Sequence, residues 1–184
     1  DVHCTTSNGF TPLYIASARG HAHIVQILID QGADVNVQAS GGLTPFYVAC
    51  EQGHAVVGRI LLDVGANFDH ASSSGLHPLH IASENGHLDV VVLLLQYNID
   101  VDVETPTGLV TPLMLSSRGG SSEVVQVLLD ADGDSSAKDI QGNTPLHYAC
   151  EEGHYHVVYA LLSANSDPHN LNNAELAAID IARQ

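Results

Sequence analysis

The chain has 184 residues, of which 21 are Asp or Glu and only 5 are Lys or Arg, so its formal net charge is −16. Nucleic acids and anionic membranes attract clustered Lys and Arg, which this sequence lacks. Nucleic acids and anionic membranes are therefore excluded as expected partners, and a basic or apolar protein surface is favoured as the partner. Hydrophobic residues make up 45% of the chain, which is enough for a core, but no apolar run approaches the roughly 18 residues of a membrane span. The three cysteines form no regular framework, which favours a reducing, cytoplasmic location over a secreted disulfide scaffold.

A period of 33 residues organises the sequence. Steps of the type Thr-Pro-Leu recur at spacings of 33, 33, 34 and 33 residues, and a degenerate sixth copy follows at Ala177 after another 33. The one extra residue falls in the loop Gly108–Val110, where an insertion costs little. A fixed period of this length indicates a repeat protein. The five clear steps begin at Thr11, Thr44, His77, Thr111 and Thr144.

Each step predicts the start of a short first helix, because a Thr hydroxyl caps free amides and Pro suits the first helical position. A glycine then permits a sharp turn, at positions 20, 53, 86, 120 and 153. Second helices with apolar residues at helical spacing are expected over 24–29, 57–62, 90–95, 124–129 and 157–162. Each of these helices ends at a residue type that tolerates the left-handed conformation; these residues are Gly32, Gly65, Asn98, Asp132 and Asn165.

Together these features resemble the ankyrin-repeat family, whose signature is a Thr-Pro-Leu-His-x-Ala motif in a 33-residue repeat. The run from Thr144 to Ala149 matches the motif in full, and Gly32–Asn36 resembles the family's hairpin between repeats. The resemblance implies an all-α repeat solenoid, a stack of helix-turn-helix units joined by β-hairpin loops and forming a single domain. Its repeats would cover approximately 5–37, 38–70, 71–103, 104–137 and 138–170, with a partial sixth at 171–184 and the tail of a preceding repeat at 1–4.

Ankyrin stacks bind other proteins in a concave groove and almost never catalyse, so the resemblance implies a monomeric, non-enzymatic interaction scaffold without a cofactor. Partner contacts in such stacks cluster on two rows of residues. The finger row precedes each Thr-Pro step and is mostly apolar; it comprises Phe10, Leu43, Leu76, Val110, Asn143 and Leu176. The helix-end row is mostly acidic and comprises Arg19, Glu51, Gln52, Glu84, Asn85, Arg118, Glu151 and Glu152. We therefore expect the groove to bind a segment with Lys or Arg beside apolar anchors; alternatively, the apolar residues only pack against neighbouring fingers.

Twelve histidines suggest a comparison with metal sites, because His77 and His80, for example, have the spacing of a ligand pair. A structural zinc site needs four ligands, usually including Cys. Four of the histidines instead recur with the repeat period, which favours a structural role in the turn between helices: His21, His54, His87 and His154. The resemblance also implies that His80 and His147 bond neighbouring backbone, which leaves only His77 as a candidate for a weak metal site.

Two cysteines precede a histidine by four residues, the spacing of a possible nucleophile and base on one helix face. However, Cys50 and Cys150 occupy the position that Ser17, Ser83 and Ser117 hold in the other repeats. We therefore interpret them as small residues at closely packed helices, and we predict no catalytic or metal-binding residue.

Two further functions stay open. Asn36 lies two residues after Asp34 and eight after Leu28, and it resembles the ankyrin hairpin asparagines that a 2-oxoglutarate oxygenase hydroxylates. The repeats could also be an accessory module of a larger enzyme or channel, because neither end of the sequence is a complete sealing repeat. We accordingly expect the sequence to be part of a longer array.

Gly58 is one of the expected weak points in the stack. It stands where the other repeats have Val25, Val91, Val125 and Val158. Glycine inside a helix costs about 1 kcal/mol, and the missing side chain would add a packing defect. The sequence therefore predicts that Gly58→Val raises the melting temperature.

Overall fold

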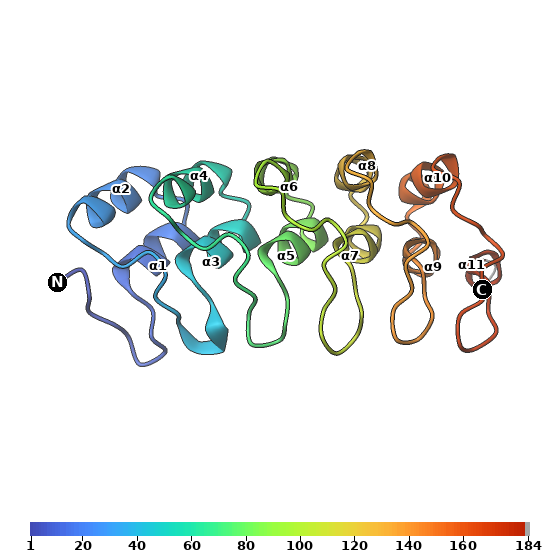
Figure 1. Ribbon diagram of the computed structural model, residues 1–184, viewed down its shortest axis with the longest axis horizontal. Helices are drawn as coiled ribbons and strands as arrows, with labels where there is room; N and C mark the ends of the chain where they lie inside the picture. Colours follow the sequence, from blue (N-terminus) through green and yellow to red (C-terminus); the bar gives the residue numbers. More distant parts are fainter. Residues whose placement is uncertain (183–184) are drawn as a thin grey trace.

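The computed structural model describes residues 1–182, which fold into stacked helix pairs. Figure 1 shows two layers, with the first helix of each pair in an inner layer, the second in an outer layer, and a loop projecting below each first helix. We call these loops fingers; they cover 5–10, 38–43, 71–76, 104–110, 138–143 and 171–176. The inner layer holds α1 (Pro12–Ala18), α3 (Pro45–Glu51), α5 (Pro78–Glu84), α7 (Pro112–Gly119), α9 (Pro145–Glu151) and α11 (Ala178–Ile181). The outer layer holds α2 (Ala22–Asp30), α4 (Ala55–Asp63), α6 (Leu88–Leu95), α8 (Ser122–Asp130) and α10 (Tyr155–Ser163).

The helical repeat architecture expected from the period is confirmed. Repeats 1 to 5 each hold one inner and one outer helix, and α11 begins a sixth. Apart from a short 3-10 turn at Ser40–Gly42 and two isolated β-bridges, the described residues form no other regular structure, and the fingers contain no extended strand. None of the described helices is long and apolar enough to cross a bilayer.

The helix boundaries follow from local chemistry. The hydroxyls of Thr11 and Thr44 each accept a hydrogen bond from a backbone N–H three residues on, at 3.0 Å, and Pro follows at the first helical position. At the other end of each pair, a left-handed residue follows the last helical residue by two or three positions, as expected from its type. Its φ is 82° at Gly32, 88° at Gly65, 52° at Asn98, 65° at Asp132 and 63° at Asn165.

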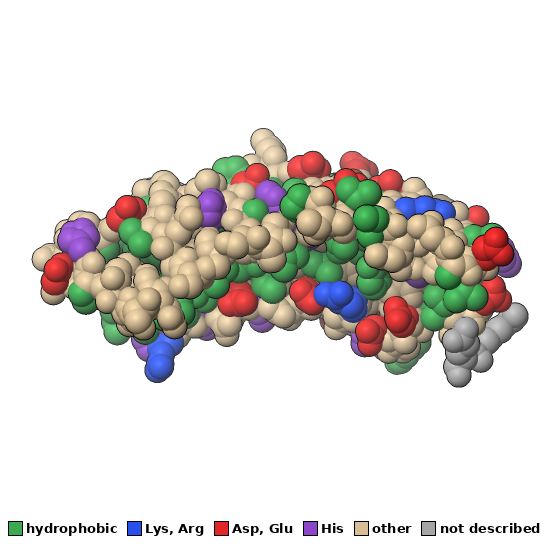
Figure 2. All heavy atoms as spheres, turned by 90° about the horizontal axis from the view of Figure 1, so that it is seen from below, with side chains coloured by type: hydrophobic (Ala, Val, Ile, Leu, Met, Phe, Trp, Pro, Cys, Tyr) green, Lys and Arg blue, Asp and Glu red, His purple; other side chains and the backbone are tan. Residues whose placement is uncertain are grey.

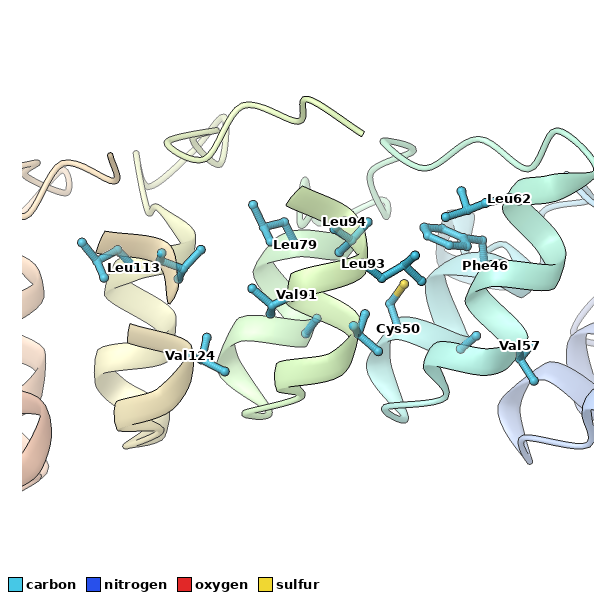
Figure 3. Packing of buried hydrophobic residues seen from close by; sticks show 14 of the residues in the cluster. Phe46, Cys50, Val57, Leu62, Leu79, Val91, Leu93, Leu94, Leu113 and Val124 are labelled. Carbon is cyan, nitrogen blue, oxygen red and sulfur yellow. The ribbon is translucent and has the colours of Figure 1, made fainter. Parts of the chain in front are cut away.

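One apolar core runs the length of the stack, between the two layers and between neighbouring repeats. Figure 3 shows its central part, where side chains from successive helices interdigitate. Each repeat contributes a fully buried inner-helix residue, namely Leu13, Phe46, Leu79, Leu113 or Leu146. Burying a side chain of this size contributes about 1.5–3 kcal/mol, and because the partners lie in adjacent repeats, each repeat depends on its neighbours for stability.

Gly58 is not the packing defect that the sequence suggested. A Cβ on Gly58 would lie 3.2 Å from Cδ2 of Leu93 and 3.6 Å from Cε2 of Phe46. Phe46 stands where the other repeats have Leu, and its larger ring occupies space beside the missing side chain; Figure 3 shows Phe46 and Leu93 in this part of the core. On packing grounds we therefore expect Gly58→Val to destabilise the fold, in contrast to the prediction from the sequence.

The turns between helices interlock from one repeat to the next. The imidazole of His54 lies against Gly20 of the preceding repeat, and that of His87 lies against Gly53. His87 Nε2 also donates a hydrogen bond to the Glu51 carbonyl at 2.9 Å. These contacts account for the periodic Gly-His pairs, because the glycine leaves room for the next imidazole as well as adopting a positive φ.

The fingers are linked by backbone hydrogen bonds in two separate groups. Ser40 N donates to Asn8 O at 3.0 Å, and Ser73 N donates to Gly41 O at 2.7 Å. In the second group, Ile140 N donates to Gly108 O at 2.9 Å and Asn173 N donates to Gln141 O at 2.8 Å. Pro106 stands where the fourth finger would supply the donor, and it has no N–H. Within residues 1–182, no backbone bond joins the third finger to the fourth.

Candidate protein-interaction surface

The finger row lies at the base of the fingers, directly before the inner helices. All six of its side chains are half-buried: Phe10, Leu43, Leu76, Val110, Asn143 and Leu176. Phe10 stacks on Tyr14 with ring centroids 4.6 Å apart. Phe10, Leu43 and Ala18 also pack against Tyr14, Ala39 and Val48 in an apolar cluster separate from the main core. Packing against neighbours thus accounts for part of this row's burial, while part of each side chain stays at the surface.

The helix-end row lies at the C-terminal ends of the inner helices. Glu51 and Glu84 are half-buried, and the rest of the row is exposed: Arg19, Gln52, Asn85, Arg118, Glu151 and Glu152. Seen from the finger side, the stack is bowed, and acidic side chains interspersed with basic ones gather along its concave edge (Figure 2). The two predicted rows thus lie at opposite ends of the inner helices, and their members repeat along the stack.

Two acidic residues of the helix-end row are already engaged within the chain. Arg118 Nη2 pairs with Glu84 Oε1 at 2.6 Å, so the carboxylate of Glu84 is neutralised by the next repeat. The amide of Gln52 lies 3.4 Å from Glu51 Oε2. By contrast, no ion pair within residues 1–182 involves Glu151 or Glu152.

Tyrosines of the inner helices lie close to this row. Burial, and then the nearby carboxylate of Glu51, raise the pKa of Tyr14. Burial is also the main reason for the raised pKa of Tyr47, which lies near Glu51 and Glu84 as well. The ring hydroxyls therefore stay protonated and can donate hydrogen bonds.

A polar network in repeat 5 was not expected from the sequence. Tyr148 donates from its hydroxyl to Asp139 Oδ2 at 2.7 Å, and burial together with this bond raises the pKa of Tyr148. Asp139 is only 4% exposed, and its Oδ1 accepts the backbone N–H groups of Gln141 and Asn143 at 2.9 and 2.7 Å. Asn172 of the next finger donates to Asn143 Oδ1 at 2.8 Å. Of these residues the sequence had singled out only Asn143. The signal that could have found Asp139 is its repeat position, which is polar in every repeat except the second, where it is Ala39. Ser72 and Thr105 stand at this position in repeats 3 and 4, and their side chains also accept the N–H of the finger-row residue.

The motif histidines hold backbone groups, as the resemblance implied. His80 Nδ1 accepts the backbone N–H of His77 at 3.2 Å, and its Nε2 donates to the Val110 carbonyl in the next repeat at 2.9 Å. His147 makes the equivalent bonds to Thr144 N and Leu176 O, at 3.1 Å each. Burial lowers the pKa of His80 to about 4, so the ring stays neutral at pH 7.

The remaining metal and nucleophile candidates gain no support. His77 Nδ1 lies 2.7 Å from Asp69 Oδ1, and no group of three or more metal-ligating side chains forms in the part of the chain that the structure describes. Cys50 is fully enclosed and Cys150 is half-buried, and burial raises the pKa of both thiols. A raised pKa disfavours the thiolate, which is the reactive form of cysteine.

Asn36, the candidate modification site, lies in the exposed turn that leads from repeat 1 to repeat 2. Its side chain bridges the two repeats. Oδ1 accepts the backbone N–H of Asn67 at 2.9 Å, and Nδ2 donates to the Gly65 carbonyl at 3.2 Å.

Comparison with known proteins agrees with this architecture. The family profile for ankyrin repeats (3 copies) matches residues 1–72, 31–105 and 102–172. The crystal structure of the human ASB11 ankyrin repeat domain superposes with a TM-score of 0.91 and 29% identity, covering 99% of this chain and 81% of that one. A stretch of 38 residues is 50% identical to Delta-latroinsectotoxin-Lt1a from Latrodectus tredecimguttatus, which is 21% of this chain but only 3% of the toxin. The profile matches extend over nearly the whole sequence, and the chain therefore belongs to the ankyrin-repeat family.

Proposed function

We propose that this chain is a protein-interaction scaffold whose concave groove binds a partner segment that carries Lys or Arg beside apolar anchors. Ankyrin repeats are generally protein-interaction modules. The observation that carries the more specific proposal is that two rows flank the inner helices. Each complete repeat presents a half-buried finger residue just before its inner helix, apolar in four of the five repeats. At the C-terminal end of the same helix it presents a partly or fully exposed residue that is charged in every repeat.

This arrangement suits recognition of an extended polypeptide. The groove is held in place by interlocked repeats, so that little conformational entropy is lost when a partner binds. The half-buried apolar side chains can add buried area, and the carboxylates favour the approach and orientation of a basic segment. Catalysis forms no part of the proposal; Cys50 is buried, and His80 and His147 bond to backbone groups.

The test is affinity capture from native lysate with a groove variant, Glu51→Lys, Glu84→Lys and Glu151→Lys combined. A matched control changes the same number of carboxylates on the outer helices, Asp30→Lys, Asp63→Lys and Asp130→Lys. These three are the last residues of α2, α4 and α8, so that both variants change the net charge equally.

The groove variant is expected to lose captured partners and to flatten the salt dependence of binding, whereas the control keeps both. Equal capture by the wild type and the groove variant would reject the groove proposal. Loss of the captured partners with both the groove variant and the control variant would show that only the total charge of the protein matters for binding.

Asn36 is a second candidate, as a substrate of asparaginyl hydroxylation. The observation in its favour is that it is exposed in an irregular turn rather than in a helix. Intact-mass and peptide mass spectrometry of the protein from its native cells would test this, and the absence of an added oxygen on Asn36 would reject it.

A further inference from the structure

We infer that the groove is divided along its length, so that a partner segment binds in one direction only, with its apolar residues on repeats 1 and 2 and its Lys or Arg side chains on repeat 5. This inference rests on the proposed function, which supplies the groove as the binding surface. It adds the order and the spacing of the partner's residues.

The N-terminal part of the groove is apolar. Phe10 and Leu43 pack with Tyr14, Ala39 and Val48 into a cluster of their own, apart from the main core. Ile15, which stands in α1 at the position of Val48 in α3, remains 41% exposed. Repeats 1 and 2 therefore offer an apolar surface that a partner could cover.

The same structural positions are polar three repeats further along. Ala39 and Leu43 correspond to Asp139 and Asn143, which belong to the network that Tyr148 and Asn172 complete. Tyr148 in turn corresponds to Val48. Equivalent positions in repeats 2 and 5 thus carry different chemistry.

The charge of the helix-end row is also concentrated in repeat 5. In repeats 1 and 2 the row holds Arg19 and Glu51, whose charges cancel. In repeats 3 and 4 it holds Glu84 and Arg118, which form an ion pair at 2.6 Å.

Repeat 5 alone supplies two adjacent carboxylates, Glu151 and Glu152, and both are exposed. No basic side chain within residues 1–182 forms an ion pair with either of them. The whole net negative charge of the row is therefore found at one end, and charge complementarity places a basic segment there.

The stack also sets the spacing between the two parts of the partner. Repeats 2 and 5 are three repeats apart, and packed helices lie about 8–10 Å apart, which gives about 25–30 Å. An extended chain advances about 3.3 Å per residue, so the apolar and basic groups of the partner should be separated by about eight residues.

The experiment is selection of a random 16-residue phage-displayed peptide library on the full 184-residue chain. The expected result is a set of enriched peptides in which an apolar cluster and a Lys/Arg cluster occur about eight residues apart, always in the same order. A synthetic peptide of that type is then titrated against variants. Glu151→Gln with Glu152→Gln should weaken its binding about tenfold, and selection on this variant should return peptides without the basic cluster.

Matched variants separate the two halves. Phe10→Gln with Ile15→Gln should remove the apolar cluster from the selected peptides and keep the basic one. Asp63→Asn with Asp130→Asn, on the outer helices, should leave both clusters in place. Thermal melting of each variant establishes that it is folded.

Two other results have distinct meanings. The division would be overturned, with groove binding left intact, if the enriched peptides compete for the groove but carry the apolar and basic clusters in either order. The same holds if selection on one of the matched variants removes both clusters together. The proposed function itself would be overturned, and the division with it, if no enriched peptide binds more weakly to the variant that combines Glu51→Lys, Glu84→Lys and Glu151→Lys.

Discussion

Gly120 lies so close to His154 of the following repeat that a Cβ on the glycine would stand 2.7 Å from Cε1 of the imidazole. His154 is held there because its Nε2 donates to the Arg118 carbonyl at 2.9 Å. A Cβ on the equivalent glycine of repeat 5, Gly153, would meet nothing within 4 Å. Both glycines have a positive φ, 81° and 73°, so they differ in their neighbours rather than in their backbone.

This difference makes the two glycines a matched pair. Gly153→Ala should cost about 1–2 kcal/mol, the penalty of a left-handed backbone alone. Gly120→Ala should cost clearly more, because the methyl group must also displace His154. Urea unfolding of both variants measures the difference, and equal losses would contradict the interlock between Gly120 and His154.

A second prediction concerns Gly58 and Phe46. Gly58→Val alone should lower the melting temperature, because the added methyl groups press on Leu93 and Phe46 and overpacking costs about 1–3 kcal/mol. Combining it with Phe46→Leu, the residue found in the other repeats, should recover this loss and add up to about 1 kcal/mol from helix propensity. A double-mutant cycle on thermal unfolding gives the coupling; stabilisation by Gly58→Val alone would restore the original, sequence-based expectation.

A third prediction is a pH dependence caused by His80. Its folded pKa is about 4, below the ordinary value of about 6.5. Between these values the unfolded chain binds more protons than the folded one, so the free energy of unfolding falls as the pH is lowered. The contribution between pH 7 and pH 5 is on the order of 2 kcal/mol.

The matched variant is His80→Met, because repeat 4 has Met114 at this position. Its unfolding free energy should depend less on pH than that of the wild type over this range, measured in urea at each pH. Parallel curves for the two proteins would mean that His80 does not titrate as described.

A fourth prediction concerns the bridge made by Asn36. Asn36→Ala removes the bonds to Asn67 N and Gly65 O and should destabilise the protein by about 1 kcal/mol. Asn36→Asp keeps the acceptor, as Asp102 does where it accepts from Asp134 N at 2.9 Å, and should cost less. Chemical denaturation should thus rank the stabilities as Asn above Asp above Ala, and an Asp variant weaker than the Ala variant would reject the bridge.

The fold could be predicted from the sequence because its signals are local and repeated. Thr11 and Thr44 cap helices through bonds to residues three positions away, and Asn98 adopts its positive φ at the expected helix end. Such features depend on only a few neighbouring residues, and agreement between copies strengthens each of them.

The details of the surface depend on side chains from different repeats and were only partly predictable. Glu84 and Arg118 were both expected in the helix-end row, but their ion pair requires knowing that the two repeats bring them within 2.6 Å. The hydrogen bond from Tyr148 to the buried carboxylate of Asp139 joins side chains nine residues apart, and no spacing rule predicts it. The relationship between Gly58 and Phe46 could have been inferred from the sequence, because both residues depart from the repeat pattern in the same repeat.

The proline in the fourth finger has a mechanical consequence. With no amide hydrogen at Pro106, the fingers form two triplets that are hydrogen-bonded internally, and within residues 1–182 no backbone hydrogen bond joins one triplet to the other. The ring of Pro106 instead packs closely against Gly75 of the third finger. Phe10 and Leu43 belong to the first triplet, whereas Glu151 and Glu152 lie at the end of α9, the helix that follows a finger of the second triplet. A partner polypeptide bound across both triplets would restrain one relative to the other. Amide hydrogen exchange in the two triplets would then become correlated only when the polypeptide is bound.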